Sequence, residues 1–250
     1  MPSLGSHLAR AHMVAERLRI PEIDDDRGSY YFGATAPDIR VITRLDRRVT
    51  HFFELDDYER QDSVQRMFEE HPGLARPAGL ETATSAFVAG YITHLVLDEA
   101  YIEDVYRPEF GHLSVIADDP RRNALDRALQ YELDRRDREN REAMAEVCAA
   151  LTGCDPLGEQ IPFIADEHLV QWRVVAADVA AQAPDYSRFR RMMARHLADA
   201  GLSDDEIDEF CASPEAAVGQ AFAHVTSERI DGFWVDAGER MHDRVRQYFR

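Results

Sequence analysis

The chain has 250 residues, 45% of them apolar, which suffices for one substantial core, and we expect a single domain over residues 1–250. Asp and Glu number 47 against 29 basic residues, all of them Arg, so the net charge is −18. So acidic a surface repels nucleic acid and anionic membranes, and we expect neither as a partner. The three cysteines, Cys148, Cys154 and Cys211, form no C-x-x-C pair and no even disulfide set. The first residues lack the features of a secretion signal, so we expect a cytoplasmic protein.

Helical patterns begin at the N-terminus. Ser6 is a candidate cap for a first helix that runs to about Leu18, with His7 on its apolar face, and Pro21 ends that helix. Residues 24–26, all Asp, are typical of a solvated loop or cap. The stretch GATAPD then forms a turn that places Asp38 after a proline, either as a helix cap or as a functional carboxylate.

The central stretch is the most apolar part of the chain. An amphipathic helix is predicted from Asp57 to Glu70. From Thr82 to Leu97 there is no charged residue, so a helix there is apolar on every side and belongs in a core. The stretch is somewhat short and rich in Ser, Thr and Gly for a membrane span, and Pro108 sets the last position at which this helix can end.

The remainder of the chain also has helical patterns. Leu125, Leu129 and Leu133 mark one long helix, and another is expected to end near Leu151. Further helices are predicted at 166–181 and 186–198. One more is expected to begin at the capping box of Ser203 and Glu206, and another at Ser213-Pro214. A last helix is expected to reach the C-terminus and to begin either near 216 or after a break near Gly232. No stretch alternates with period two, so the chain is predicted to be an all-α, multi-helix bundle around the buried central helix.

Two polar residues interrupt the apolar helix. His94 and Asp98 are four residues apart and therefore lie on one helix face. An imidazole and a carboxylate directed into a core need partners, because a buried uncompensated charge is costly. Either the two bond to each other, or they bind a metal ion. His7 and His51 present the same choice between structural packing and metal binding.

The five candidate residues lie in four short motifs, whose order and flanking residues form a specific pattern. The motifs are GSHLARA with His7, GATAPD with Asp38, THFF with His51, and AFVAGYITHLVLD with His94 and Asp98. Over residues 1–105 the chain resembles the zinc-dependent phospholipase C family, whose relatives include single-strand-specific nucleases. The resemblance implies an all-α fold with a zinc cluster between helices.

The same resemblance implies roles for these residues. His7, His51 and His94 match zinc-binding histidines, and Asp98 matches an aspartate that bridges two zinc ions. Asp38 matches a carboxylate that acts as general base or orients the attacking water. Imidazoles and carboxylates are ligands that leave a position of the zinc shell open for water.

The chain departs from the family in three places. It begins with Met-Pro where secreted members have a processed tryptophan that binds zinc through its amine. Glu103 and Asp104 occupy the region of a further zinc-binding histidine. The family's remaining pair has the shape H-x-x-x-E or H-x-x-x-D, and the only later pair of that shape here is His224 with Glu228, which a surface helix also explains. His112 and His168 are the other substitutes, so we expect two zinc ions and at most three.

The expected function is metal-dependent phosphodiester hydrolysis, in which metal-activated water attacks a lipid-like or soluble phosphodiester. Two alternatives remain. One is a catalytically silent, metal-stabilised helical module that serves as a binding or scaffold protein. The other is a phosphomonoesterase built on the same metal site. The sequence does not determine the oligomeric state.

Overall fold

The computed structural model describes residues 1–155 and 160–250, and within these ranges all regular structure is helical. The all-α prediction is therefore confirmed. The elements of the first half are α1 (Leu4–Leu18), α2 (Pro21–Asp25), α3 (Arg27–Gly33), the 3₁₀ helix η1 (Ala36–Ile39), α4 (Arg40–Thr43), α5 (Arg47–His51), α6 (Ser63–Glu70), η2 (Pro72–Leu74), η3 (Pro77–Gly79), α7 (Thr82–Tyr101), the π-helical segment η4 (Ile102–Tyr106) and α8 (Arg107–Glu109). The elements of the second half are α9 (Arg122–Asp137), α10 (Arg141–Gly153), α11 (Asp166–Ala181), α12 (Phe189–Asp199), α13 (Asp204–Ala212), α14 (Pro214–Phe222) and α15 (Ser227–Tyr248).

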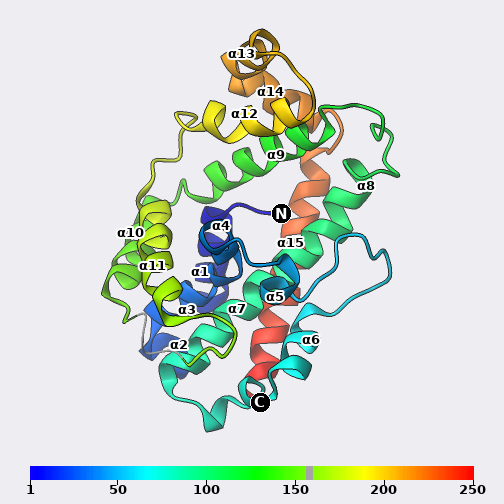
Figure 1. The fold of residues 1–250 in the computed structure, drawn as a ribbon. Helices are drawn as coiled ribbons and strands as arrows, with labels where there is room; N and C mark the ends of the chain where they lie inside the picture. The colour runs from blue at the N-terminus through cyan, green and yellow to red at the C-terminus, as the bar shows by residue number, and fades with distance from the viewer. Residues whose placement is uncertain (156–159) are drawn as a thin grey trace.

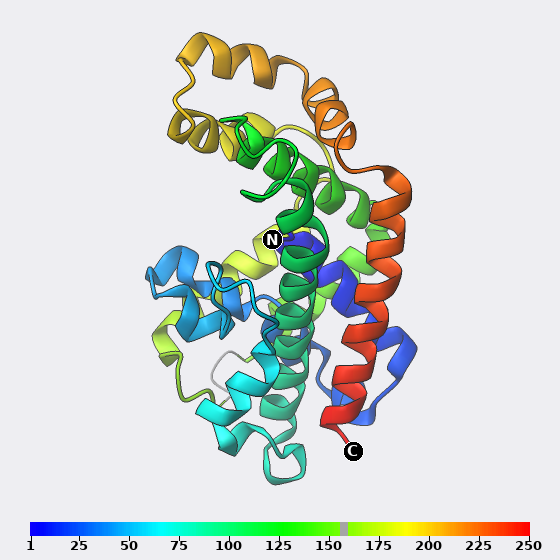
Figure 2. The same ribbon diagram turned by 90° about the vertical axis from the view of Figure 1, so that its right-hand side faces the viewer.

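Helix α7 is the centre of the bundle. Every residue from Thr84 to Asp98 is buried, as the lack of charge in this stretch predicts. Helix α3 packs against one side of α7, and the long α15 runs beside it (Figures 1 and 2). None of the described helices is long and apolar enough to span a membrane.

Two glycines let α3 and α7 cross with their backbones in contact. A Cβ atom on Gly33 would lie 1.9 Å from the carbonyl oxygen of Phe87, and one on Gly90 would lie 1.8 Å from that of Tyr30. No side chain fits at either position. The contact brings the end of α3, where Ala34 follows Gly33, against the turn of α7 that carries His94.

A second, smaller apolar cluster lies at one end of the molecule. Helices α12, α13 and α14 pack there on α9, and Figure 1 shows them together at the top of the view. Phe189, Met193 and Leu197 of α12 belong to this cluster together with Tyr131 of α9, and the rings of Phe189 and Tyr131 lie 5.3 Å apart. The main core, built around α7, lies on the other side of α9.

Several predicted helix ends differ from the observed ones. Helix α1 begins at Leu4 with Ser3 at the N-cap position, and the amide of Ser6 instead donates to Asp134 Oδ1 at 3.0 Å. Helix α6 begins at Ser63, not at Asp57, because the Asp62 side chain caps it by accepting from the amide of Gln65.

Three further predictions concern Asp26, Pro108 and Gly232. Asp25 ends the short helix α2, and the Asp26 side chain caps α3, which confirms the cap alternative predicted for these aspartates. The sequence predicts that the central helix ends at Pro108 at the latest, but helical structure continues to Glu109. The π-helical η4 precedes the proline, and Pro108 lies in the first turn of α8, where its lack of an N–H group costs no hydrogen bond. Helix α15 starts at Ser227 and is continuous through Gly232. The capping box of Ser203 and Glu206 is confirmed.

Candidate metal centre

Five predicted site residues from four elements meet beside α7. His7 comes from α1, Asp38 from η1, His51 from the last position of α5, and His94 and Asp98 from α7. The three histidines and Asp98 are buried, whereas the side chain of Asp38 is 19% exposed. Asp38 is therefore the member of the cluster that faces solvent.

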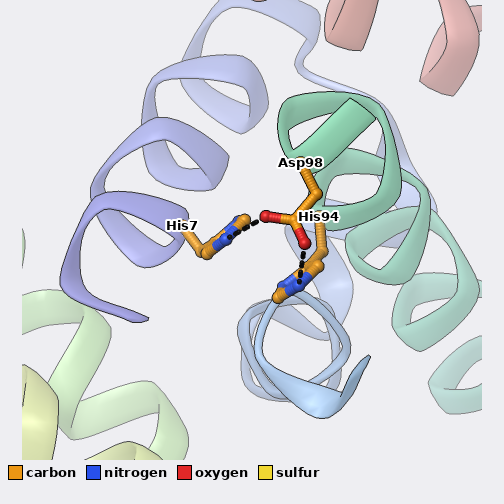
Figure 3. A group of neighbouring side chains, drawn as sticks. All are labelled: His7, His94 and Asp98. Atoms are coloured by element: carbon orange, nitrogen blue, oxygen red, sulfur yellow. Dashed lines mark ion pairs between the residues drawn. The ribbon is translucent and has the colours of Figure 1, made fainter. Parts of the chain in front are cut away.

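Asp98 lies at the centre of the cluster. Its Oδ1 is 3.3 Å from Nε2 of His7, and its Oδ2 is 3.4 Å from Nε2 of His51 and 3.7 Å from Nε2 of His94. Figure 3 shows His7 and His94 directed at the two oxygens of this carboxylate. Asp38 Oδ1 lies 3.5 Å from His51 Nε2 on the outer side.

The atoms that converge here are those that a metal ion would bind. Nε2 of His7, His51 and His94 and Oδ1 of Asp98 are buried and make no hydrogen bond among the described residues. Such orphaned buried polar atoms are rare unless an ion, ligand or water satisfies them. Tetrahedral ligands at about 2.0–2.2 Å from zinc lie about 3.3–3.6 Å apart. Three of the four separations, 3.3, 3.4 and 3.5 Å, fall in that range, and the distance from Asp98 Oδ2 to His94 Nε2 is slightly longer at 3.7 Å. The residues therefore fit a metal ion.

Hydrogen bonds to the other ring nitrogens fix the orientation of two imidazoles. Nδ1 of His94 lies 2.9 Å from the carbonyl oxygen of Ala34, to which it can only donate, so its Nε2 keeps a lone pair. His51 Nδ1 lies 2.9 Å from Oγ1 of Thr50, and the tautomer in which it donates leaves Nε2 free. Partners of this kind usually set the tautomer of metal-binding histidines.

The third imidazole, that of His7, is held by stacking. Its ring lies 3.7 Å from the ring of His94 at an interplanar angle of 6°. Neither of its nitrogens has a hydrogen-bond partner among the described residues. The Nε2 atom of His7 faces Asp98 Oδ1 at 3.3 Å, so this is the nitrogen placed to bind a metal ion beside Asp98.

Sequence reasoning missed Arg47, which belongs to the cluster. Its Nη2 donates to Asp98 Oδ2 at 2.8 Å, and the residue is only 8% exposed. Nε and Nη1 of the same guanidinium are buried without a hydrogen-bond partner among the described residues. Arg47 precedes His51 by four residues, so a helix over this segment places both on one face, and this spacing was the available signal.

Charge and burial set the protonation of the cluster. Burial, reinforced by the neighbouring imidazole of His7, lowers the pKa of His94 to about 3. Burial and the charge of Arg47 lower the pKa of His51. Burial would raise the pKa of Asp98, but the contacts with His7 and Arg47 hold it well below its usual range. At neutral pH the imidazoles of His51 and His94 are thus neutral and the carboxylate of Asp98 is ionised, which are the forms that bind metal.

A strained residue ends the segment that carries His51. Phe52 adopts φ of +53°, a left-handed conformation that bulky side chains rarely adopt. The Phe52 ring is fully buried among Tyr91, His71 and Phe163, and the Tyr91 hydroxyl donates to the carbonyl of Thr50. This packing compensates the strain and fixes the direction of His51.

The five residues form two overlapping groups in which each residue offers one ligand atom within 4.8 Å of the others. One group is His7, His94 and Asp98, and the other is Asp38, His51 and His94. Only Nε2 of His94 is available to either group, because Nδ1 faces Ala34. One imidazole nitrogen binds one ion, so both groups cannot hold three-ligand ions at once.

The remaining predicted candidates lie outside both groups. His112 is exposed beside Tyr58, and His168 is half-buried on α11. His224 lies in the turn before α15 whereas Glu228 lies on that helix, so the two do not form the helical pair that their spacing predicts. The described residues contain no third group of this kind.

The fold and the cluster define an all-α protein with buried histidine and aspartate groups that could hold a metal ion. No protein-family model, curated protein or solved structure matches the chain. The resemblance to zinc-dependent phospholipases C stays a prediction that follows from the motifs alone.

Proposed function

We propose that this protein is a metal-dependent phosphodiester hydrolase whose site is the cluster around Asp98. The observation that carries the proposal is the convergence of unpartnered Nε2 atoms of three histidines on one buried carboxylate. A core that needed only His–Asp pairing would satisfy these atoms with hydrogen bonds. Their availability, with Asp38 at the solvent side, suits a hydrolytic metal site.

We assign zinc as the metal, because a set of imidazoles and carboxylates at tetrahedral spacing suits it. The more complete site comprises Asp38, His51 and His94, and a second, weaker ion would be held by His7 and Asp98. Bound zinc supplies activated water and positive charge beside a phosphoryl group.

Two residues of the chain would act on the substrate directly. Asp38 reaches the solvent side of the cluster, where the carboxylate oxygen that does not bind the metal would orient the attacking water. Burial opposes ionisation of Asp38, but its 3.5 Å contact with His51 and the charge of His94 hold its pKa below the usual range. A carboxylate of low pKa is a weak base, so orienting water suits it better than storing a proton. Arg47 would donate its free Nε and Nη1 to phosphoryl oxygens.

The preferred substrate is a small or lipid-like phosphodiester. The net charge of −18 disfavours nucleic acid, because the phosphate backbone would approach a surface of like charge. A cytoplasmic enzyme of this type would meet soluble phosphodiesters or the lipids of the inner leaflet.

The test is an assay of zinc-loaded protein on bis-p-nitrophenyl phosphate and p-nitrophenylphosphorylcholine. We expect turnover of at least one of them, and a loss of about 100-fold or more in His51→Asn, together with lower zinc content. His12→Asn is the matched control, since His12 is half-buried and bonded to Tyr31 outside the cluster.

The assay also separates the alternatives. Protein that holds zinc but cleaves neither diester is a metal-stabilised binding or scaffold module, and the hydrolase proposal then fails. Turnover of p-nitrophenyl phosphate alone identifies a phosphomonoesterase on the same site.

A further inference from the structure

A second feature of the molecule is a cavity of about 420 Å³ between the two apolar clusters. Helix α9 forms one wall and α12 contributes His196, while η4, α8 and the loop after α5 form the other side. Its charged and aromatic lining includes Arg107, Arg122, Arg127, His112, His196 and Tyr58. The function proposed above does not use these residues.

The cavity gathers cations in a protein that is otherwise rich in acidic groups. Within residues 1–155 and 160–250, no carboxylate lies within ion-pair distance of Arg107, Arg122 or Arg127, although most other arginines have such a partner. Nε of Arg107 and Nε of Arg122 are buried and make no hydrogen bond there. Burial and the charge of Arg127 lower the pKa of the nearby His196. These cations lack a counter-anion.

The two carboxylates that line the cavity do not fill that role. Asp126 is buried, and its oxygens accept hydrogen bonds from Tyr101 at 2.8 Å and from Gln130 at 2.6 Å. Asp56 is exposed on the loop. Arg127 donates to Gln130 at 2.8 Å and not to either carboxylate.

The arginine on the opposite wall is held in place by uncharged groups. Arg107 donates to the carbonyl oxygens of Leu55 and Asp57, and its guanidinium lies 4.5 Å from the ring of Tyr58. These contacts position the guanidinium without neutralising it. Its charge is therefore available to an anion that enters the cavity.

The cavity adjoins the metal centre. Ile102, which lines it, follows Asp98 by one helical turn. Met1 also lines it.

We propose that this cavity binds the phosphate group of a small phosphorylated molecule. Several guanidinium and imidazole donors converge there, and a phosphate has enough oxygens to accept from more than one of them. That the bound molecule is also the substrate rests on the proposed hydrolase function, but the binding itself does not.

The experiment is calorimetric titration of the metal-free, full-length protein with inorganic pyrophosphate. We expect one molecule bound per chain, and about tenfold weaker binding in Arg122→Gln and in Arg127→Gln. Arg121→Gln is the matched control, because Arg121 neighbours Arg122 but pairs with Asp119, and this variant is expected to bind like the parent. Arg122 makes no side-chain hydrogen bond in the described residues, so its replacement is not expected to unfold the chain.

The outcomes separate the two proposals. Absence of pyrophosphate binding to the metal-free protein overturns the cavity proposal, as does binding that is unchanged in both arginine variants. Binding that appears only after zinc is added lies at the metal centre and likewise overturns the cavity proposal. Binding of succinate as tightly as pyrophosphate overturns the assignment to phosphate. If pyrophosphate binding depends on the arginines but the protein hydrolyses no phosphoester, the proposal of a phosphate-binding cavity is supported and only the hydrolase proposal is refuted.

Discussion

Asp98 balances the charges of the cluster, because Arg47 contacts one of its oxygens while three imidazoles surround it. An arginine buried against a single carboxylate depends on that partner, and removal of one member of a buried pair typically costs about 3–5 kcal/mol. Asp98 therefore has two roles, one toward the metal and one toward Arg47.

Asp98→Asn is expected to lower the zinc content and the stability together. The amide removes a metal-binding oxygen and leaves Arg47 without its counter-charge, so unfolding should become easier by about 3 kcal/mol or more. Elemental analysis and thermal unfolding measure the two effects. Asp104→Asn is the control, since Asp104 forms an exposed pair with Arg240. Unchanged zinc stoichiometry in Asp98→Asn would contradict the assignment.

Acidification should destabilise the metal-free protein through its buried histidines. The pKa of His94 is about 3 in the folded chain and about 6.5 when unfolded, so between these values the unfolded chain binds a proton that the folded one does not. Stability is therefore retained above pH 6.5 and falls as the pH drops toward 3, by up to about 1.4 kcal/mol per pH unit for this group.

Urea unfolding at pH 7.5, 6 and 5 measures this effect. The control variant is His94→Asn, whose side-chain amide keeps a donor for the Ala34 carbonyl but does not titrate. The variant should have a shallower dependence on pH. An identical slope in parent and variant would show that His94 does not titrate in this range.

At the scale of elements, the crossing of α3 and α7 determines the position of His94. Gly33 and Gly90 let the two backbones meet, and the crossing places the Ala34 carbonyl oxygen 2.9 Å from His94 Nδ1. The apolar composition of 82–97 predicts that α7 is buried. It does not predict which face meets α3, because a helix that is apolar all round has no preferred side.

Gly90→Ala should therefore destabilise the protein by more than about 3 kcal/mol, since the added methyl would overlap the Tyr30 carbonyl and neither backbone can move freely. Chemical denaturation measures the change. Gly238→Ala is the matched control on α15, where no atom lies within 4 Å of the added Cβ. The control should be neutral or up to about 1 kcal/mol more stable, because alanine favours helix. Equal stability of the two variants would contradict the close crossing.

At the scale of the whole molecule, the helical pattern predicts the all-α fold, and spacing alone places His94 beside Asp98. Asp38 and His51 were candidates because their flanking motifs resemble a known family, and the fold brings His51 to Asp98 and Asp38 to His51. The cationic cavity was not predictable, since Arg107 and Arg127 come from separate helices with no local pattern in common. The observed helix ends that differ from the predicted ones depend on side-chain caps such as that of Asp62. Neighbouring residues in the sequence are equally suitable as caps, so the sequence does not determine which of them begins the helix.

The central claim is that His51, His94 and their carboxylates hold a metal. Crystals of zinc-loaded protein, measured on both sides of the zinc absorption edge, test it most directly. We expect an anomalous peak within about 2.0–2.2 Å of Nε2 of His51 and of Nε2 of His94. Zinc-loaded crystals in which these nitrogens bind only water or Asp98, with no anomalous peak between them, would contradict it.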